Sequence, residues 1–168
     1  MIIKRLLHQI IKIFSRPSTR GVNCVKKEDT MPNYFTLKEL CYSKTAIEKG
    51  IDNTPSWDIV ENLKYLCVCL DALREAWQAP IVVTSGYRCA ELNKIVGGVA
   101  KSHHKLGLAA DVQCLDMKKF DEFKAFVANF FKHYDGEFSQ VIIEKSGNTQ
   151  WIHISVADNR RQIFKLEV

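Results

Sequence analysis

The stretch VVTSGYRCAELNKIVGGVAKSHHKLGLAADV, residues 82–112, decides the fold because it contains several local structures in succession. The segment IVVTS at 81–85 is short and β-branched, which predicts a strand that runs into the turn SGYR. A helix is predicted at 90–95, and a glycine-containing loop follows it. The segment LAADVQ at 108–113 then predicts a second strand that leaves the SHHKLG loop. The stretch therefore alternates strand, helix and strand.

Helices are predicted on both sides of this stretch. Apolar residues recur at helical spacing through residues 57–78, and the helix ends before Pro80, which cannot continue it. A shorter helix is predicted within YFTLKEL, with Thr36 as its N-cap and Glu39 three residues later. Another helix covers about residues 117–134 and carries a wide apolar face. These apolar faces indicate packing against a core.

Three further strands are predicted in the last third of the chain. They are QVIIE at 140–144, QWIHIS at 150–155 and QIFKLEV at 162–168, and a KSGNT turn joins the first two. Helices flanking a small sheet define an α+β fold. We therefore predict a small antiparallel sheet flanked by helices.

The size and charge of the chain indicate one globular domain with an extension before it. With 168 residues and 46% hydrophobic content, the chain can bury a core without disulfides or a structural metal. Residues 1–27 carry seven basic side chains and no acid, whereas the remaining 141 residues hold 17 basic and 19 acidic groups. The net charge of +5 is thus no sign of nucleic-acid binding. We expect an extension and linker over residues 1–32 and the functional domain over residues 33–168.

The extension begins with MIIKRLLHQIIKIFSR, which predicts a short basic amphipathic helix over residues 1–16. Charges at Lys4, Arg5 and Lys12 interrupt its apolar residues, so it matches neither a membrane span nor a standard signal peptide. Weak contact with a membrane surface is one interpretation. The alternatives are a disordered extension and a segment upstream of a natural start at Met31.

The six cysteines show no paired spacing of the kind that a zinc ribbon or a redox motif needs. Cys67 and Cys69 form only a CxC, and in a helix their side chains point about 200° apart. They can therefore neither bridge each other nor share a metal ion. We expect all six cysteines to be ordinary reduced thiols.

His104, Asp111 and His153 are the candidate metal ligands. His104 and Asp111 lie seven residues apart where a loop passes into a strand, so their side chains can meet at one point. His153 lies in a predicted strand between apolar neighbours that face the other way. Two imidazoles and a carboxylate leave the fourth tetrahedral position of zinc open for water, as in catalytic sites. Taken singly, each residue also fits a structural role, such as a core histidine or a turn carboxylate.

The motifs around these residues resemble those of a known enzyme family. The pattern SxHxxGxAxD runs from Ser102 to Asp111, SGYR precedes it, and a closing WxH ends at His153. Together with the opening YFTLKEL and GIDNTP, they make residues 33–156 similar to the zinc D,D-peptidases. That family includes D-alanyl-D-alanine carboxypeptidases, vancomycin-resistance dipeptidases and phage endolysins, and its fold is related to the Hedgehog signalling domain. The resemblance selects His104 over His103 as the ligand.

The resemblance implies a zinc metallopeptidase that cuts D-alanyl bonds in peptidoglycan stem peptides, as a D,D-carboxypeptidase or as an endopeptidase of endolysin type. Zn²⁺ would be held by His104, Asp111 and His153. Arg88 would face the substrate and hold either its terminal carboxylate or the developing oxyanion. Ser102 would donate a hydrogen bond to the substrate or to a ligand, and a plain N-cap role is the alternative.

The general base is where this sequence departs from the family pattern. Many members carry an acid three residues before the last histidine, but here that position is Gln150, which cannot act as a base. Glu144 is the nearest replacement if the strands that flank the KSGNT turn pair with each other. A solvent-facing strand end is its alternative interpretation. His103 and Asp158 are weaker substitutes.

The missing acid also supports a hypothesis from another class: a zinc-holding domain that binds a cell-wall peptide or a protein without cutting it. The expected partner in the leading interpretation is the peptidoglycan stem peptide, and we expect a monomer. A target in the bacterial cell wall without a standard signal peptide fits a phage protein released at lysis, or export through an atypical N-terminal helix.

Overall fold

The computed structural model describes residues 34–165 of the chain. The predicted basic helix of residues 1–16, the linker up to residue 32 and the last residues of the final predicted strand lie outside the described residues. The proposed boundary between residues 32 and 33 therefore stays a prediction. No helix within residues 34–165 is long and apolar enough to cross a membrane.

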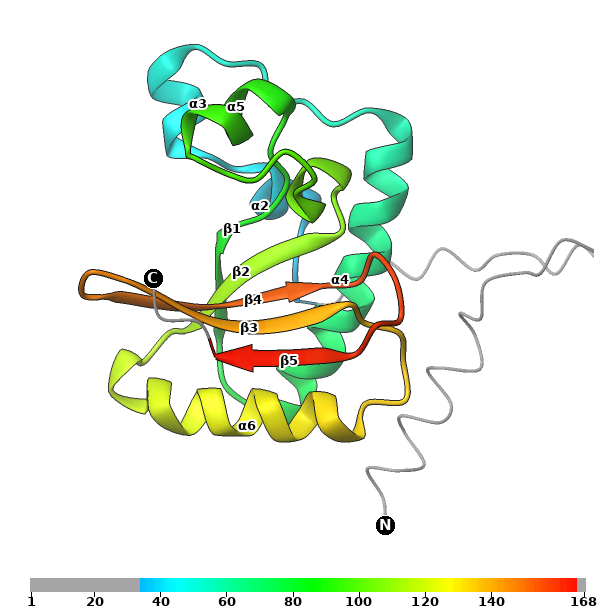
Figure 1. The fold of residues 1–168 in the computed structure, drawn as a ribbon, viewed down its shortest axis with the longest axis vertical. Helices are drawn as coiled ribbons and strands as arrows, with labels where there is room; N and C mark the ends of the chain where they lie inside the picture. The colour runs from blue at the N-terminus through cyan, green and yellow to red at the C-terminus, as the bar shows by residue number, and fades with distance from the viewer. Residues whose placement is uncertain (1–33, 166–168) are drawn as a thin grey trace, which may run out of the picture. The chain divides into compact units, whose positions relative to one another are not determined.

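Helices of two kinds, long and short, surround the sheet. The described helices are α2 (Leu37–Cys41), α3 (Lys44–Lys49), α4 (Trp57–Trp77), α5 (Ala90–Ile95) and α6 (Phe120–His133), with 3₁₀ turns η1 (His103–Leu106) and η2 (Met117–Lys119). Figure 1 shows α4 passing behind the strands, α6 along the lower side of the view, and α2, α3 and α5 gathered at the upper end. The short helices thus build one end of the domain.

The strands form one five-stranded sheet. They are β1 (Ile81–Ser85), β2 (Ala109–Cys114), β3 (Gln140–Ser146), β4 (Thr149–Ser155) and β5 (Gln162–Lys165). Their order across the sheet is β1-β2-β4-β3-β5. The predicted α+β arrangement of a small sheet flanked by helices is confirmed.

One strand corrects the prediction of a wholly antiparallel sheet. The pairings β1–β2, β2–β4 and β3–β4 are antiparallel, but β5 runs parallel to β3. The end of β4 lies beside the start of β3, with Ser155 opposite Gln140. The chain then crosses past this end of β3 and enters its outer edge as β5, so both strands run the same way. Residues 156–161 form the connecting segment.

The core lies where α4 and α6 pack on one face of the sheet. Trp77 at the end of α4 contacts Phe123 of α6, with ring centroids 5.1 Å apart. The alternating residues Ile152 and Ile154 of β4 point to this face and are fully buried. The predicted apolar helix faces supply further large buried side chains: Leu63, Leu66, Leu70, Leu73, Val127 and Phe131. The alternate residues of β4 are left for the opposite face.

Local capping explains where the short elements begin and end. The predicted N-cap is confirmed, because Thr36 Oγ1 accepts a hydrogen bond from the Glu39 amide at 3.1 Å. Helix α3 was not predicted, although Ser43 caps it and Gly50 ends it at a φ of 64°. The helix predicted at 117–134 is divided, because the Asp116 side chain caps a separate turn, η2, ahead of α6.

Candidate metal centre

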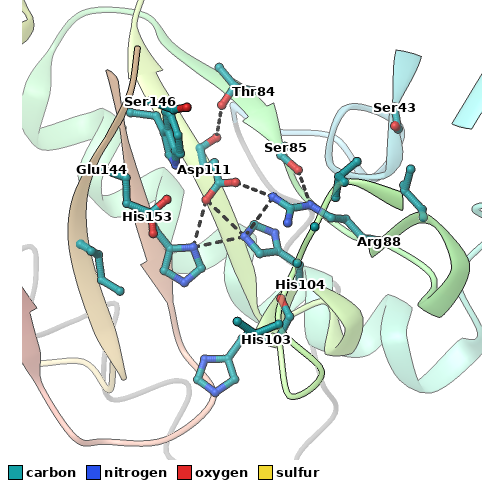
Figure 2. A pocket seen from close by; sticks show the side chains of 18 of the residues that line it. Ser43, Thr84, Ser85, Arg88, His103, His104, Asp111, Glu144, Ser146 and His153 are labelled. Carbon is teal, nitrogen blue, oxygen red and sulfur yellow. Dashed lines mark hydrogen bonds and ion pairs between the residues drawn. The ribbon is translucent and has the colours of Figure 1, made fainter. Parts of the chain in front are cut away.

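Three side chains meet on the face of the sheet that is turned away from α6. Asp111 of β2 and His153 of β4 are direct partners in the strand register, so their side chains leave the sheet side by side. His104 reaches the same point from η1, the turn just before β2. His153 Nδ1 lies 2.9 Å from Asp111 Oδ1, and His104 Nε2 lies 3.2 Å from each of these two atoms. Figure 2 shows the three side chains converging.

The protonation of His104 indicates that this cluster needs a cation. His104 Nδ1 lies 2.7 Å from the carbonyl oxygen of Gly86, which can only accept, so Nδ1 carries the proton. On a neutral ring, Nε2 would offer a lone pair to Asp111 Oδ1, which is also an acceptor, so either a bound cation or a second proton on the ring is needed between them. Tetrahedral zinc with bonds of about 2.0–2.1 Å separates its ligand atoms by about 3.3 Å, close to the spacing here. The donor set therefore fits zinc.

Asp111 is fixed as an ionised ligand. Burial would by itself raise the pKa of Asp111, but the charge of His104 and hydrogen bonds from both histidines outweigh it and hold that pKa well below its usual range. Its second oxygen, Oδ2, accepts a hydrogen bond from Arg88 Nη2 at 2.6 Å. Oδ1 thus remains directed at the histidines, and the carboxylate offers one oxygen to a metal ion.

The SGYR turn holds Arg88 beside the cluster. Arg88 Nε donates to Ser85 Oγ at 2.8 Å, and the Arg88 amide donates to the His104 carbonyl oxygen at 3.2 Å. The turn needs glycine at position 86, because a Cβ there would overlap the carbonyl group of Leu40. Arg88, predicted as a substrate-binding residue, lines the cavity but also has a structural partner in Asp111.

Ser102 comes directly before η1 and is 8% exposed. Its side chain makes no capping hydrogen bond to that turn, so the hydroxyl is not used in the N-cap role that the sequence left open. Ser102 lines the same cavity as the three candidate ligands. Its predicted role as a hydrogen-bond donor to the substrate stays a prediction.

The cluster lies in an open cavity of about 1140 Å³, and Glu144 reaches it from the neighbouring strand. Alternate residues of β3 line the cavity, and Glu144 lies opposite Trp151 of β4. Figure 2 shows the Glu144 carboxylate pointing toward His153. Among the described lining residues, only Glu144 and Asp111 carry carboxylates. Glu144 is half-buried and lies on the cavity face, which differs from the solvent-facing strand end considered for it.

The other candidates for a base lie less favourably. The side chain of Gln150 points to the α6 side of the sheet, where Lys124 Nζ donates to its Oε1 at 3.3 Å. Asp158 does not line the cavity and is paired with Arg160. His103 does line it, on the other side of the cluster from Glu144 (Figure 2). The lack of an acid at position 150 therefore does not mean that the cavity lacks a base.

Three basic lining residues were not predicted from the sequence: Lys44, Lys101 and Arg160. Lys101 comes just before the SxH motif, and the motif itself could have drawn attention to it. Arg160 lies in the connection between β4 and β5, where neither a motif nor a periodic pattern marks it. Only the crossing of the chain past β3 brings it to the cavity.

Comparison with known families agrees with this geometry. No curated protein matches the chain significantly. The family model described as Peptidase M15 matches residues 33–155, a range that contains the three candidate ligands, Arg88 and Glu144. The family is zinc-dependent, and the cluster of His104, Asp111 and His153 could hold a metal ion. Because the match covers most of the chain, this protein belongs to the peptidase M15 family of zinc metallopeptidases.

Proposed function

We propose that this protein is a zinc peptidase that hydrolyses D-alanyl bonds in peptidoglycan stem peptides, as a D,D-carboxypeptidase or an endopeptidase. Membership of the M15 family supports the metallopeptidase chemistry. The observation that carries the proposal is the position of Glu144, a carboxylate on the cavity face beside an open three-ligand cluster. A structural zinc site would have four protein ligands and no base.

His104, Asp111 and His153 would hold the zinc ion. When bound, zinc lowers the pKa of water from 15.7 to about 7 and polarises a carbonyl group. Glu144 accepts the proton of the attacking water and then donates it to the amine that leaves. No residue among 34–165 forms a described hydrogen bond with the Glu144 carboxylate, so it is available for both transfers.

Arg88 is suited to stabilise the oxyanion that develops on the scissile carbonyl. Its Nη2 and Nε are occupied by Asp111 and Ser85, which fix the guanidinium plane next to the ligands. Its Nη1 has no described partner within residues 34–165 and can donate to the developing negative charge. A donor that is held in place before the reaction needs no reorganisation during it.

The lining of the cavity suits an acidic peptide. Four basic side chains, from Lys44, Arg88, Lys101 and Arg160, face two acidic ones. Stem peptides carry carboxylates, both at their ends and on their acidic residues, so this balance favours them over basic peptides. The cavity is also open and large enough to admit a chain of several residues.

Release of D-alanine from a stem peptide ending in D-alanyl-D-alanine tests the proposal. Zinc-loaded wild type should release it, and Glu144→Gln and His153→Ala should not. Glu144→Gln should still bind one zinc ion, whereas His153→Ala should bind it weakly. Lys145→Met is the matched control, because Lys145 is exposed and points away from the cavity. If wild type binds zinc one to one but releases nothing, intact sacculi test for endopeptidase cleavage. Inactivity there as well would support the zinc-holding binding domain.

A further inference from the structure

The connection between β4 and β5, residues 156–161, carries an arginine into the cavity. Arg160 lines the cavity, and its Nε lies 2.9 Å from both carboxylate oxygens of Asp158. The Arg160 amide also donates to Asp158 Oδ1, at 3.1 Å. Within residues 34–165, no described partner occupies its terminal nitrogens, Nη1 and Nη2. The guanidinium is thus held by one edge, and its other edge is free.

The backbone of this connection is fixed. Ser139 Oγ donates to the Asp158 carbonyl oxygen at 3.0 Å and accepts from the Asp158 amide at 2.6 Å. The next residue after Arg160 is Arg161, whose φ of 55° is unusual for a residue with a side chain. Its guanidinium donates to the carbonyl oxygens of Tyr134 and Gly136, at 2.6 and 2.9 Å. The sharp bend therefore directs the two arginines to different places, and Arg160 to the cavity.

Arg160 lies on the side of the metal cluster away from the proposed base. The connection that carries Arg160 is bound to Ser139, just before the start of β3, whereas Glu144 lies toward the other end of that strand, near the hairpin. In Figure 2, His103 and Glu144 lie on opposite sides of the pair formed by His104 and His153. The cavity thus has an acidic end and a basic end, with the cluster between them.

Two of the other basic lining residues, Arg88 and Lys44, are less suited to hold a substrate group. Arg88 already uses Nη2 and Nε on Asp111 and Ser85. Lys44 is 78% exposed and pairs with Glu48. Arg160 combines a fixed direction with a free planar edge, which can form two parallel hydrogen bonds to a carboxylate.

We propose that Arg160 binds the terminal carboxylate of the substrate peptide, which makes the protein a carboxypeptidase. This inference rests on the peptidase function proposed above and refines it. The carboxylate of the residue to be released lies at Arg160, the scissile carbonyl lies at the cluster beside Arg88, and the rest of the peptide extends toward Glu144 and the β3–β4 hairpin. Arg160 is then a specificity residue, and Arg88 is left to the oxyanion.

Two stem peptides that differ only at their ends test this assignment, one with a free terminal carboxylate and one with a terminal amide. Zinc-loaded wild type, Arg160→Met, Arg160→Lys and the control Lys145→Met are compared by KM and kcat for each peptide. Arg160→Met should raise KM for the acid about 10- to 100-fold, the value expected for loss of a charge-assisted hydrogen bond. It should leave KM for the amide and the zinc content unchanged. Arg160→Lys should recover part of the loss, and Lys145→Met should behave as wild type.

The contrary outcomes are distinct. Equal preference for the acid in wild type and Arg160→Met would overturn the role of Arg160 and leave the peptidase function intact. Equal cleavage of acid and amide by wild type would overturn the carboxylate site and indicate an endopeptidase. Failure of wild type to cleave either peptide or intact sacculi would reject the proposed function, and this inference with it.

Discussion

The two walls of the cavity hold their polar side chains in different ways. In the turn wall, residues 84–111, the two groups next to Asp111 are tied down: Arg88 bonds Ser85 and Asp111, and His104 bonds a backbone carbonyl. In the hairpin wall, β3 and β4, the described hydrogen bonds of the His153 side chain are those to the cluster, and the Glu144 carboxylate has none. Ligands and oxyanion donors act from one position, whereas a proton carrier must approach two atoms in turn. The walls thus differ as their proposed roles require.

The largest effect should follow from replacing Asp111, whose carboxylate joins the turn wall to His153 of the hairpin wall. Asp111→Ala removes a ligand and also leaves the guanidinium of Arg88, only 16% exposed, without its carboxylate. Loss of one partner of a buried pair costs about 3–5 kcal/mol. We expect no stoichiometric zinc binding, no measurable peptidase activity and a lower free energy of unfolding, measured by metal analysis, peptide hydrolysis and urea denaturation.

Asp111→Asn is the control for this prediction, because the amide keeps the shape of the side chain and can still accept from Arg88. It should lose zinc affinity but keep most of the stability. If both variants bound zinc as tightly as wild type, the metal centre would have to lie elsewhere.

The next largest effect tests what defines the general base. We expect that it must lie on the cavity face of the hairpin wall, as Glu144 does, and that an acid at position 150 would not serve. Glu144→Gln should lower kcat about 10²- to 10⁴-fold with zinc retained, the usual contribution of a general base. Adding Gln150→Glu to that variant should not restore activity, because residue 150 points to α6, where Lys124 binds it. Hydrolysis of the stem peptide by the single and double variants measures this. Recovery in the double variant would show that position 150 can reach the cluster.

The same contrast explains how much of the molecule could be predicted from the sequence. In the turn wall, local backbone geometry demands particular residues, such as Gly86 against Leu40 and Gly107 at a φ of 66°, so the motif is readable. The predicted strands at 81–85 and 150–155 and the long helix from residue 57 agree with the structure to within a residue or two, because their apolar patterns are regular. Glu144 could be named as the candidate base only on the assumption that the strands on either side of the KSGNT turn pair with each other.

Features that depend on distant parts of the chain were missed. The parallel direction of β5 and the arrival of Arg160 at the cavity both follow from the way the chain crosses the end of β3. No local pattern encodes that crossing. Helix α3 was missed for a different reason, since Ser43 and Gly50 are ordinary cap residues but the helix between them is only six residues long.

A smaller effect should come from loosening the turn wall without touching a ligand. In Gly86→Ala the new methyl group would overlap the Leu40 carbonyl group, so the turn must move, and with it the carbonyl that orients His104. Loss of a group that hydrogen-bonds a metal ligand typically lowers zinc affinity about 10- to 100-fold. Competition with a zinc chelator measures this affinity. Gly147→Ala, at the open tip of the hairpin, is the control and should leave zinc affinity unchanged, with at most a small loss of stability from its φ of 56°.

The smallest effect is expected for alkylation of the cysteines in the core behind both walls. The rate of this reaction reports whether water and reagent enter the core. Burial raises the pKa of Cys67 and Cys69 to about 12, so roughly one thiol in 10,000 is ionised at pH 8. Cys89, which caps α5 in the turn wall, is only partly buried. In a Cys24→Ser background, an alkylating reagent at pH 8 should therefore modify Cys89 first and leave Cys67 and Cys69 unmodified until urea is added, as mass spectrometry of peptides would detect. Rapid modification of Cys67 in the native protein would mean that the core opens, and the rigidity assigned to the turn wall, which packs on that core, would no longer hold.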